Sequence, residues 1–145
     1  MVPSRSLRTG TFAIAALLLS IGCSAAPAGS AKTDVAVAVT DTSIQAVPAT
    51  VPAGEVTLKI TNNGATLHEV EVFTLPDGVD AATIPVESFI AQTDSVGMEV
   101  IDEVEGIVPN GTPSLPVNLA AGRYALICNL PGHYALGMHT TLTVQ

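Results

Sequence analysis

The sequence has few charged and aromatic residues, and these scarcities exclude several classes of protein. Charged residues make up 12% of the 145 positions, so a charge-rich disordered chain is excluded. Only 5 Lys and Arg stand against 13 Asp and Glu, for a net charge of −8, and no nucleic-acid partner is expected because such binding needs a basic face. Aromatic residues make up 3%, with no tryptophan, so the core must be aliphatic.

Cysteines and the common catalytic motifs are also scarce. Two cysteines are too few for a disulfide-dense scaffold. The glycine-rich phosphate loop, the dinucleotide fingerprint, the GxSxG elbow and the HExxH zinc motif are all absent from the sequence. What the sequence does have is 48% hydrophobic residues, enough for one domain with a buried core.

The first 23 residues have the pattern of an export signal. Arg5 and Arg8 precede an apolar stretch over residues 11–21. That stretch is well short of the roughly 20 apolar residues that a spanning helix needs. It ends at Gly22 and Cys23, and a small residue directly before a cysteine resembles the lipobox of bacterial lipoproteins. The resemblance implies that Cys23 is lipidated.

Lipidation of Cys23, with residues 1–23 as signal peptide, would anchor the protein at the outer face of the cell membrane. Two alternatives stay open: ordinary export to the periplasm or medium with cleavage after Ala25 or Ala26, and an uncleaved anchor. With Cys23 lipidated, Cys128 would be the lone thiol of an exported protein. Such a thiol indicates a metal ligand, a catalytic nucleophile or an oxidation liability.

The rest of the chain predicts a short tether and one all-β domain. Residues 24–33 are small and polar and predict a flexible tether, followed by a domain over residues 34–145. Hydrophobic residues then alternate with a period of two, and turn signals separate the runs, which predicts an antiparallel sandwich or barrel. The expected strands are 34–39, 55–61, 68–72, 124–128 and 138–144. The run at 124–128 is apolar on both faces, as in a central strand, whereas residues 77–100 are irregular and leave room for a short helix or a long loop over 81–93.

The most informative pattern lies near the C-terminus, where Cys128, His133 and Met138 form a C-x4-H-x4-M motif. A thiolate, imidazoles and a weak thioether are the donors of a mononuclear copper site. One connecting loop holds all three residues, and Pro131 and Gly132 tighten it.

A second imidazole must come from elsewhere in the chain. His68 begins a predicted strand on its apolar face, where a ligand would be rigidly held. His139 falls on the outward face of the last strand and is expected to be a surface residue beside the site.

These residues resemble the cupredoxin family, the plastocyanin- and azurin-like blue copper proteins. The resemblance rests on the C-terminal signature Gly122-x-Tyr124-x-x-x-Cys128-x-x-Pro131-Gly132-His133-x-x-x-Gly137-Met138, preceded by Asn63-Gly64-x-x-x-His68. It implies a Greek-key β-sandwich with one copper ion near one end. It also implies that His68, Cys128 and His133 are equatorial ligands and that Met138 is the axial ligand.

The function that this resemblance implies is electron transfer rather than catalysis. A monomeric carrier tethered to the membrane would pass single electrons between transient redox partners. Electrons would leave through His133, with Pro131, Tyr134 and Leu136 forming an apolar docking face. The alternative is an extracytoplasmic protein for copper storage or delivery.

Two further features stay open at this point. Glu69 and Asn129 replace the Asn and the Ser or Thr that many family members have beside the first His and the Cys, and we expect Asn129 to donate a hydrogen bond to Glu69. The acidic run over residues 99–105 predicts either a solvated edge or a docking patch for a basic partner.

Overall fold

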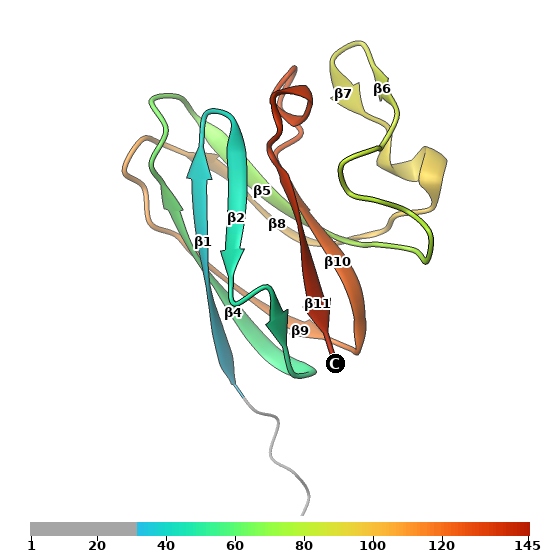
Figure 1. Cartoon of the computed structure of the whole chain (residues 1–145). Helices are drawn as coiled ribbons and strands as arrows, with labels where there is room; N and C mark the ends of the chain where they lie inside the picture. Colours follow the sequence, from blue (N-terminus) through green and yellow to red (C-terminus); the bar gives the residue numbers. More distant parts are fainter. Residues whose placement is uncertain (1–31) are drawn as a thin grey trace, which may run out of the picture.

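Residues 32–145 are described by a computed structural model, in which two β-sheets pack face to face (Figure 1). The first sheet has the strand order β2-β1-β4-β9, and the second has the order β3-β11-β10-β5-β8. The strands of the first sheet are β1 (Thr33–Thr40), β2 (Ser43–Val47), β4 (Gly54–Asn62) and β9 (Ser114–Leu119). Those of the second are β3 (Thr50–Val51), β5 (His68–Thr74), β8 (Val100–Ile107), β10 (Gly122–Ile127) and β11 (His139–Val144).

The predicted all-β sandwich is confirmed, and its sheets are mixed. β1 pairs with β4 in parallel, as β11 does with β3, whereas the other strand pairs are antiparallel. Strands distant in sequence are neighbours in both sheets, such as β4 with β9 and β10 with β5. This is Greek-key connectivity.

The core between the sheets is aliphatic and follows the alternation seen in the sequence. Leu58 at the centre of β4 is fully buried, as are Val35 and Val37 on β1 and Val70 and Val72 on β5. Because side chains alternate across a strand, the intervening residues of β1 and β5 face outward. The period-two pattern therefore predicted the core face of these strands correctly.

β10 is buried on both faces because the segment predicted to be irregular covers its outer side. Ala125, Ile127 and Phe73 form a second apolar cluster with Ala81, Ile84, Ala91, Met98 and Tyr134. The segment contains no α-helix. It contains a hairpin of β6 (Val86–Glu87) and β7 (Ile90–Ala91), followed by the 3-10 helix η1 (Thr93–Val96).

The sequence did not predict β2, β3, β8 or β9, and β8 is the longest of these strands. β8 lies at the open edge of the second sheet, and most of its residues are exposed. Acidic side chains such as those of Glu103 and Glu105 protect such an edge against pairing with another chain. Both alternatives for the acidic run, a solvated edge and a docking patch, require this exposure.

The predicted metal-binding loop lies at the end of the sandwich opposite the start of β1. Figure 1 shows, at the top of the view, the connection between β10 and β11, the turn between β1 and β2, and the β6–β7 hairpin. The 3-10 helix η2 (Tyr134–Leu136) lies within the β10–β11 connection. Among residues 32–145, no helix is long and apolar enough to cross a membrane.

Candidate metal centre

Three of the predicted ligands come together at this end of the sandwich. The Nδ1 atoms of His68 and His133 lie 3.2 Å apart. The sulfur of Cys128 lies 3.4 Å from His133 Nδ1 and 4.0 Å from His68 Nδ1. The donor atoms of all three residues lie within 4.8 Å of one another.

His68 is held at the first position of β5 by the loop that precedes it. Its side chain is fully buried, as is that of Asn62 at the end of β4. The Asn62 amide donates to the backbone carbonyls of Thr66 and Ile107 at 2.9 and 2.8 Å, and its oxygen accepts from the Gly64 N–H at 2.8 Å. The buried Asn62 side chain therefore fixes the conformation of the loop that precedes His68.

The loop from Cys128 to Met138 is closed by its own backbone hydrogen bonds. The Cys128 N–H donates to the Met138 carbonyl at 3.1 Å, and the Met138 N–H donates to the His133 carbonyl at 3.3 Å. Gly137 has φ of 105°, and a Cβ there would lie 2.9 Å from the Thr42 carbonyl oxygen. The chain thus needs a glycine where the loop passes the β1–β2 turn.

Met138 is fully buried and belongs to the same core cluster as Cys128. Its backbone contacts both Cys128 and His133 through the bonds just given. Met138 therefore lies buried at the base of the loop that carries Cys128 and His133.

The outer nitrogen of His68 has a charged partner that the sequence did not reveal. Asp41 Oδ1, from the β1–β2 turn, lies 3.0 Å from His68 Nε2. Hydrogen bonds from the Ala65 backbone and the Thr66 hydroxyl hold the pKa of Asp41 well below its usual range. Asp41 is therefore ionised at neutral pH, and His68 Nδ1 is left to face the cluster.

The segment bearing Cys128 is tied to β5 and to the hairpin. Asn129 donates its backbone N–H to Glu69 Oε1 at 2.9 Å, so the expected bond is present, with a backbone donor. The Asn129 side chain accepts from the Ala91 N–H at 2.8 Å and donates to the Ala91 carbonyl at 3.2 Å. The Gly132 N–H also donates to the Phe89 carbonyl, at 2.8 Å. The hairpin is thus bonded directly to the ligand loop.

Burial sets the protonation states of two of the donors. Desolvation lowers the pKa of His133, so its imidazole is neutral at pH 7 and able to bind a metal. Desolvation also raises the pKa of Cys128, so its thiol is protonated at neutral pH, and a bound cation would favour the thiolate.

The donor set fits one metal ion. Bonds of about 2.0 Å to nitrogen and 2.3 Å to sulfur place three donors around one ion roughly 3.5–3.8 Å apart. The observed separations of 3.2, 3.4 and 4.0 Å bracket this range. Two imidazoles, a thiolate and a buried thioether nearby are the donors that favour copper.

The other predicted residues lie in different places. His139 is partly buried and packs against Tyr134, with ring centroids 5.1 Å apart, outside the donor cluster. Tyr134 is 4% exposed, because its hydroxyl donates to the Ala81 carbonyl and accepts from the Ile84 N–H. The expectation that Tyr134 lies on a docking face is therefore wrong, since it anchors the segment that covers β10. Cys23 lies outside the described residues.

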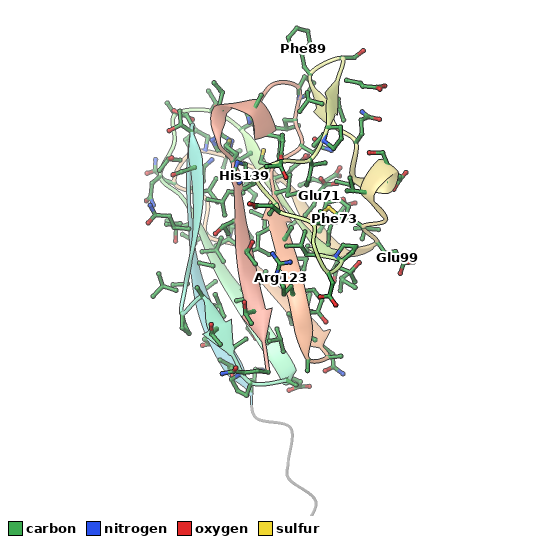
Figure 2. All side chains as sticks on the ribbon, turned by 45° about the vertical axis from the view of Figure 1, so that its right-hand side comes forward. Glu71, Phe73, Phe89, Glu99, Arg123 and His139 are labelled. Carbon is green, nitrogen blue, oxygen red and sulfur yellow. The ribbon has the colours of Figure 1, made fainter. Side chains whose placement is uncertain are left out.

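Glu71 on β5, labelled in Figure 2, lies among other acidic residues of β5 and β8. Glu71 pairs directly with Glu103 across the two strands. Burial, aided by the charges of Glu69 and Glu103, raises the pKa of Glu71 to about 7. Like charges directly opposite one another are unfavourable in a sheet, so this pair weakens the fold at neutral pH.

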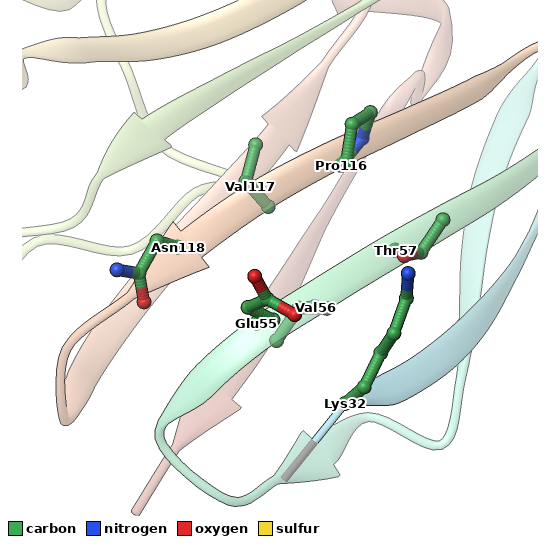
Figure 3. A pocket seen from close by; sticks show the side chains of 7 residues that line it. All are labelled: Lys32, Glu55, Val56, Thr57, Pro116, Val117 and Asn118. Carbon is green, nitrogen blue, oxygen red and sulfur yellow. The ribbon is translucent and has the colours of Figure 1, made fainter. Parts of the chain in front are cut away.

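A pocket lies elsewhere in the molecule, on the outer face of β4 and β9 (Figure 3). Its lining comprises Lys32, Glu55, Val56, Thr57, Pro116, Val117 and Asn118. These residues include no histidine or cysteine, so the pocket does not compete with the cluster as a copper site.

Comparison with known proteins agrees with the fold and the cluster. The Cupredoxin-like domain family matches residues 11–144. Auracyanin from Roseiflexus castenholzii is 23% identical with a TM-score of 0.57, and the match covers 81% of this chain and 99% of that one. Auracyanin A from Chloroflexus aurantiacus, described as a "blue" copper protein, is 24% identical with a TM-score of 0.53, covering 77% and 99%.

Reduced rusticyanin is 24% identical with a TM-score of 0.54, covering 81% of this chain and 82% of that one. At these identities the solved structures show a shared fold. No curated protein matches the sequence.

The free energy of unfolding should fall less between pH 4.5 and pH 8 in Glu71→Gln than in the wild type. The carboxyl ionises near its ordinary value of 4.5 in the unfolded chain and near 7 in the folded protein. The folded state therefore binds more protons between these values, and the free energy of unfolding falls as the pH rises through them. At pH 8 the variant should be more stable by on the order of 1 kcal/mol, after allowing for solvent screening of a half-exposed group.

Denaturant unfolding at pH 4.5 and pH 8 measures this effect. Glu87→Gln, the same change on an exposed residue of the hairpin, serves as the control. An unchanged pH dependence in Glu71→Gln would contradict the assignment.

Proposed function

The chain belongs to the cupredoxin-like domain family, and on this premise we propose that it is a type 1 (blue) copper protein that carries single electrons. The observation that carries the proposal is the convergence of His68, His133 and Cys128 at 3.2 to 4.0 Å. When bound, one copper ion supplies a one-electron Cu(I)/Cu(II) couple. The protein would take an electron from a reduced partner and give it to an oxidised one.

In this proposal His68, Cys128 and His133 are the equatorial ligands and Met138 is the axial one. The burial of Met138 and its backbone bonds to the other loop ligands support its role. Hydrogen bonds from outside the cluster hold the ligand segments: Asp41 contacts His68, and Glu69 contacts Asn129. Ligands fixed in this way move little between two oxidation states, which favours rapid electron transfer.

Electrons would pass through the edge of His133, since its side chain is partly exposed whereas those of His68 and Cys128 are fully buried. Leu136 is 60% exposed in the same loop. Phe89, which is 71% exposed, stands at the tip of the hairpin bonded to that loop (Figure 2). Together with Pro131 these side chains would form a small apolar face for weak redox encounters.

We further propose that Cys23 carries a lipid that tethers the domain to the outer face of the membrane. The lipobox-like Gly22-Cys23 pair supports this assignment. The roughly ten residues from Cys23 to Thr33 span at most about 35 Å. β1 starts at the end of the sandwich opposite the ligand loop (Figure 1). A lipid there would leave the metal centre directed away from the attachment point.

Storage or delivery of copper is the competing function. The complete burial of His68 and Cys128 favours retention of the metal, since release would require opening the core. Catalysis at a second metal is not proposed, because His139 is the one imidazole outside the cluster.

We expect Cys128→Ser to abolish the intense blue absorption, because the thiolate that produces it is lost. Copper reconstitution of the wild type and the variant, followed by visible and EPR spectra, measures the change. Circular dichroism checks that the variant remains folded. Blue colour that survives in the folded variant would refute the ligand assignment.

Met138→Leu should keep copper but raise the midpoint potential, because a weak donor to Cu(II) is replaced by an apolar side chain of similar volume. A threefold fall in relative Cu(II) affinity would correspond to a rise of about 28 mV for a one-electron couple. Cyclic voltammetry of both proteins measures the shift. An unchanged potential would show that Met138 is not an axial ligand.

Leu136→Ser should slow electron exchange between oxidised and reduced copies of the protein. In this proposal the two copies dock through the apolar face that contains Leu136. Loss of about 1 kcal/mol of encounter energy lowers the exchange rate roughly fivefold. NMR line broadening in mixtures of the two oxidation states measures the rate. Val47→Ser is the matched control, because Val47 is 65% exposed and lies on β2, away from the ligand loop. Equal rates in both variants would refute the docking face.

A further inference from the structure

The contact between Asp41 and His68 carries an inference that rests on, and deepens, the proposed function. His68 enters the metal cluster through Nδ1, so its Nε2 points the other way and meets Asp41 Oδ1 at 3.0 Å. The imidazole is fully buried, whereas the Asp41 side chain is 44% exposed. A carboxylate from the β1–β2 turn thus reaches the buried ligand from the solvent side.

The loop before β5 fixes the Asp41 carboxylate in place. The Ala65 N–H lies 3.0 Å from both carboxylate oxygens, and the Thr66 N–H donates to Oδ1 at 3.1 Å. The Thr66 hydroxyl donates to the same oxygen at 2.8 Å. With three donors from one loop and a fourth from His68, the carboxylate has one orientation, and that orientation faces the imidazole.

Gly64 leaves the room that this arrangement requires. A Cβ at Gly64 would collide with Asp41 Oδ1 and would lie 2.8 Å from His68 Nε2. Any larger residue would therefore wedge the carboxylate away from the ring. The hydrogen bond between Asp41 and His68 therefore requires a glycine at position 64, in the loop between β4 and β5.

Asp41, rather than the Thr66 hydroxyl, is the acceptor for a proton on His68 Nε2. The Thr66 hydroxyl oxygen lies 3.4 Å from that nitrogen, and its own proton is already directed to Asp41. A bond to a carboxylate at 3.0 Å is shorter and charge-assisted, and such bonds are about twice as strong as neutral ones. The ring N–H therefore belongs to Nε2, and the lone pair belongs to Nδ1.

We propose that Asp41 is a positioning residue that holds His68 with its Nδ1 lone pair toward the cluster, and that its negative charge stabilises Cu(II) over Cu(I). A carboxylate bonded to the far nitrogen makes an imidazole a stronger electron donor. The added electron density and the nearby negative charge both favour the more positive ion. Asp41 should therefore set the potential of the centre below the value that a neutral partner would give.

The test is Asp41→Asn in the full copper-loaded chain. The amide keeps an oxygen that can accept from the Ala65 and Thr66 N–H groups, but it removes the charge. We expect the Cu(II) affinity relative to Cu(I) to fall about tenfold, in the range typical for partners of metal ligands. For a one-electron couple this equals a rise of about 59 mV in midpoint potential.

Asp34→Asn is the matched control, because it removes the same charge from the exposed far end of β1. A potential shift in Asp41→Asn no larger than that in Asp34→Asn would overturn the proposed role of the charge. Blue absorption in the wild type and in both variants shows that the copper centre itself is intact, so this outcome is distinguishable from failure of the proposed function.

A second measurement uses the metal-free wild type and so does not depend on the folding of any variant. Nitrogen-15 NMR of the histidine rings reports which nitrogen of His68 carries the proton. We expect the proton on Nε2. A proton found mainly on Nδ1 would overturn the positioning role, whether or not the protein binds copper.

Discussion

The metal centre depends on the backbone hydrogen bond that joins Cys128 to Met138. This bond continues the β10–β11 ladder by one step beyond Ile127 and His139, so the two ends of the ligand loop are held at the spacing of paired strands. Because the loop is closed at its base, His133 within it has few positions available. A pair of strands thus fixes three of the four proposed ligands before any metal binds.

The fourth proposed ligand needs separate support because it comes from another part of the chain. His68 begins β5, and β5 lies beside β10 in the same sheet, which brings the imidazole to the end of the loop. The strand alone does not fix the rotation of the ring. Contacts from the β1–β2 turn supply that constraint through Asp41. Both sheets therefore contribute to one site, which ties the metal centre to the packing of the whole sandwich.

The sequence predicted the ligand motif and five of the strands that face the core, because both depend on local spacing. It did not predict β2 and β9, although alternate residues of these strands are also buried in the core. Alternation gave the buried faces of β1, β4 and β5, and the C-x4-H-x4-M pattern gave the loop. It did not predict Asp41, since an acid in a turn between strands has an ordinary local explanation. Nor did it predict β8, whose exposed acidic residues lack an apolar face. Contacts between distant segments leave no local pattern to recognise.

The segment over residues 77–100 covers the outer face of β10, and this explains why the strand is apolar on both faces. A strand with a solvated outer face would carry polar residues where Ala125 and Ile127 lie. The covering segment buries them, and hydrogen bonds from Tyr134, Asn129 and Gly132 join it to the ligand loop. A rigid link of this kind means that Phe89 keeps a fixed place relative to His133. The same residues that stabilise the sheet therefore also shape the surface through which a redox partner would approach.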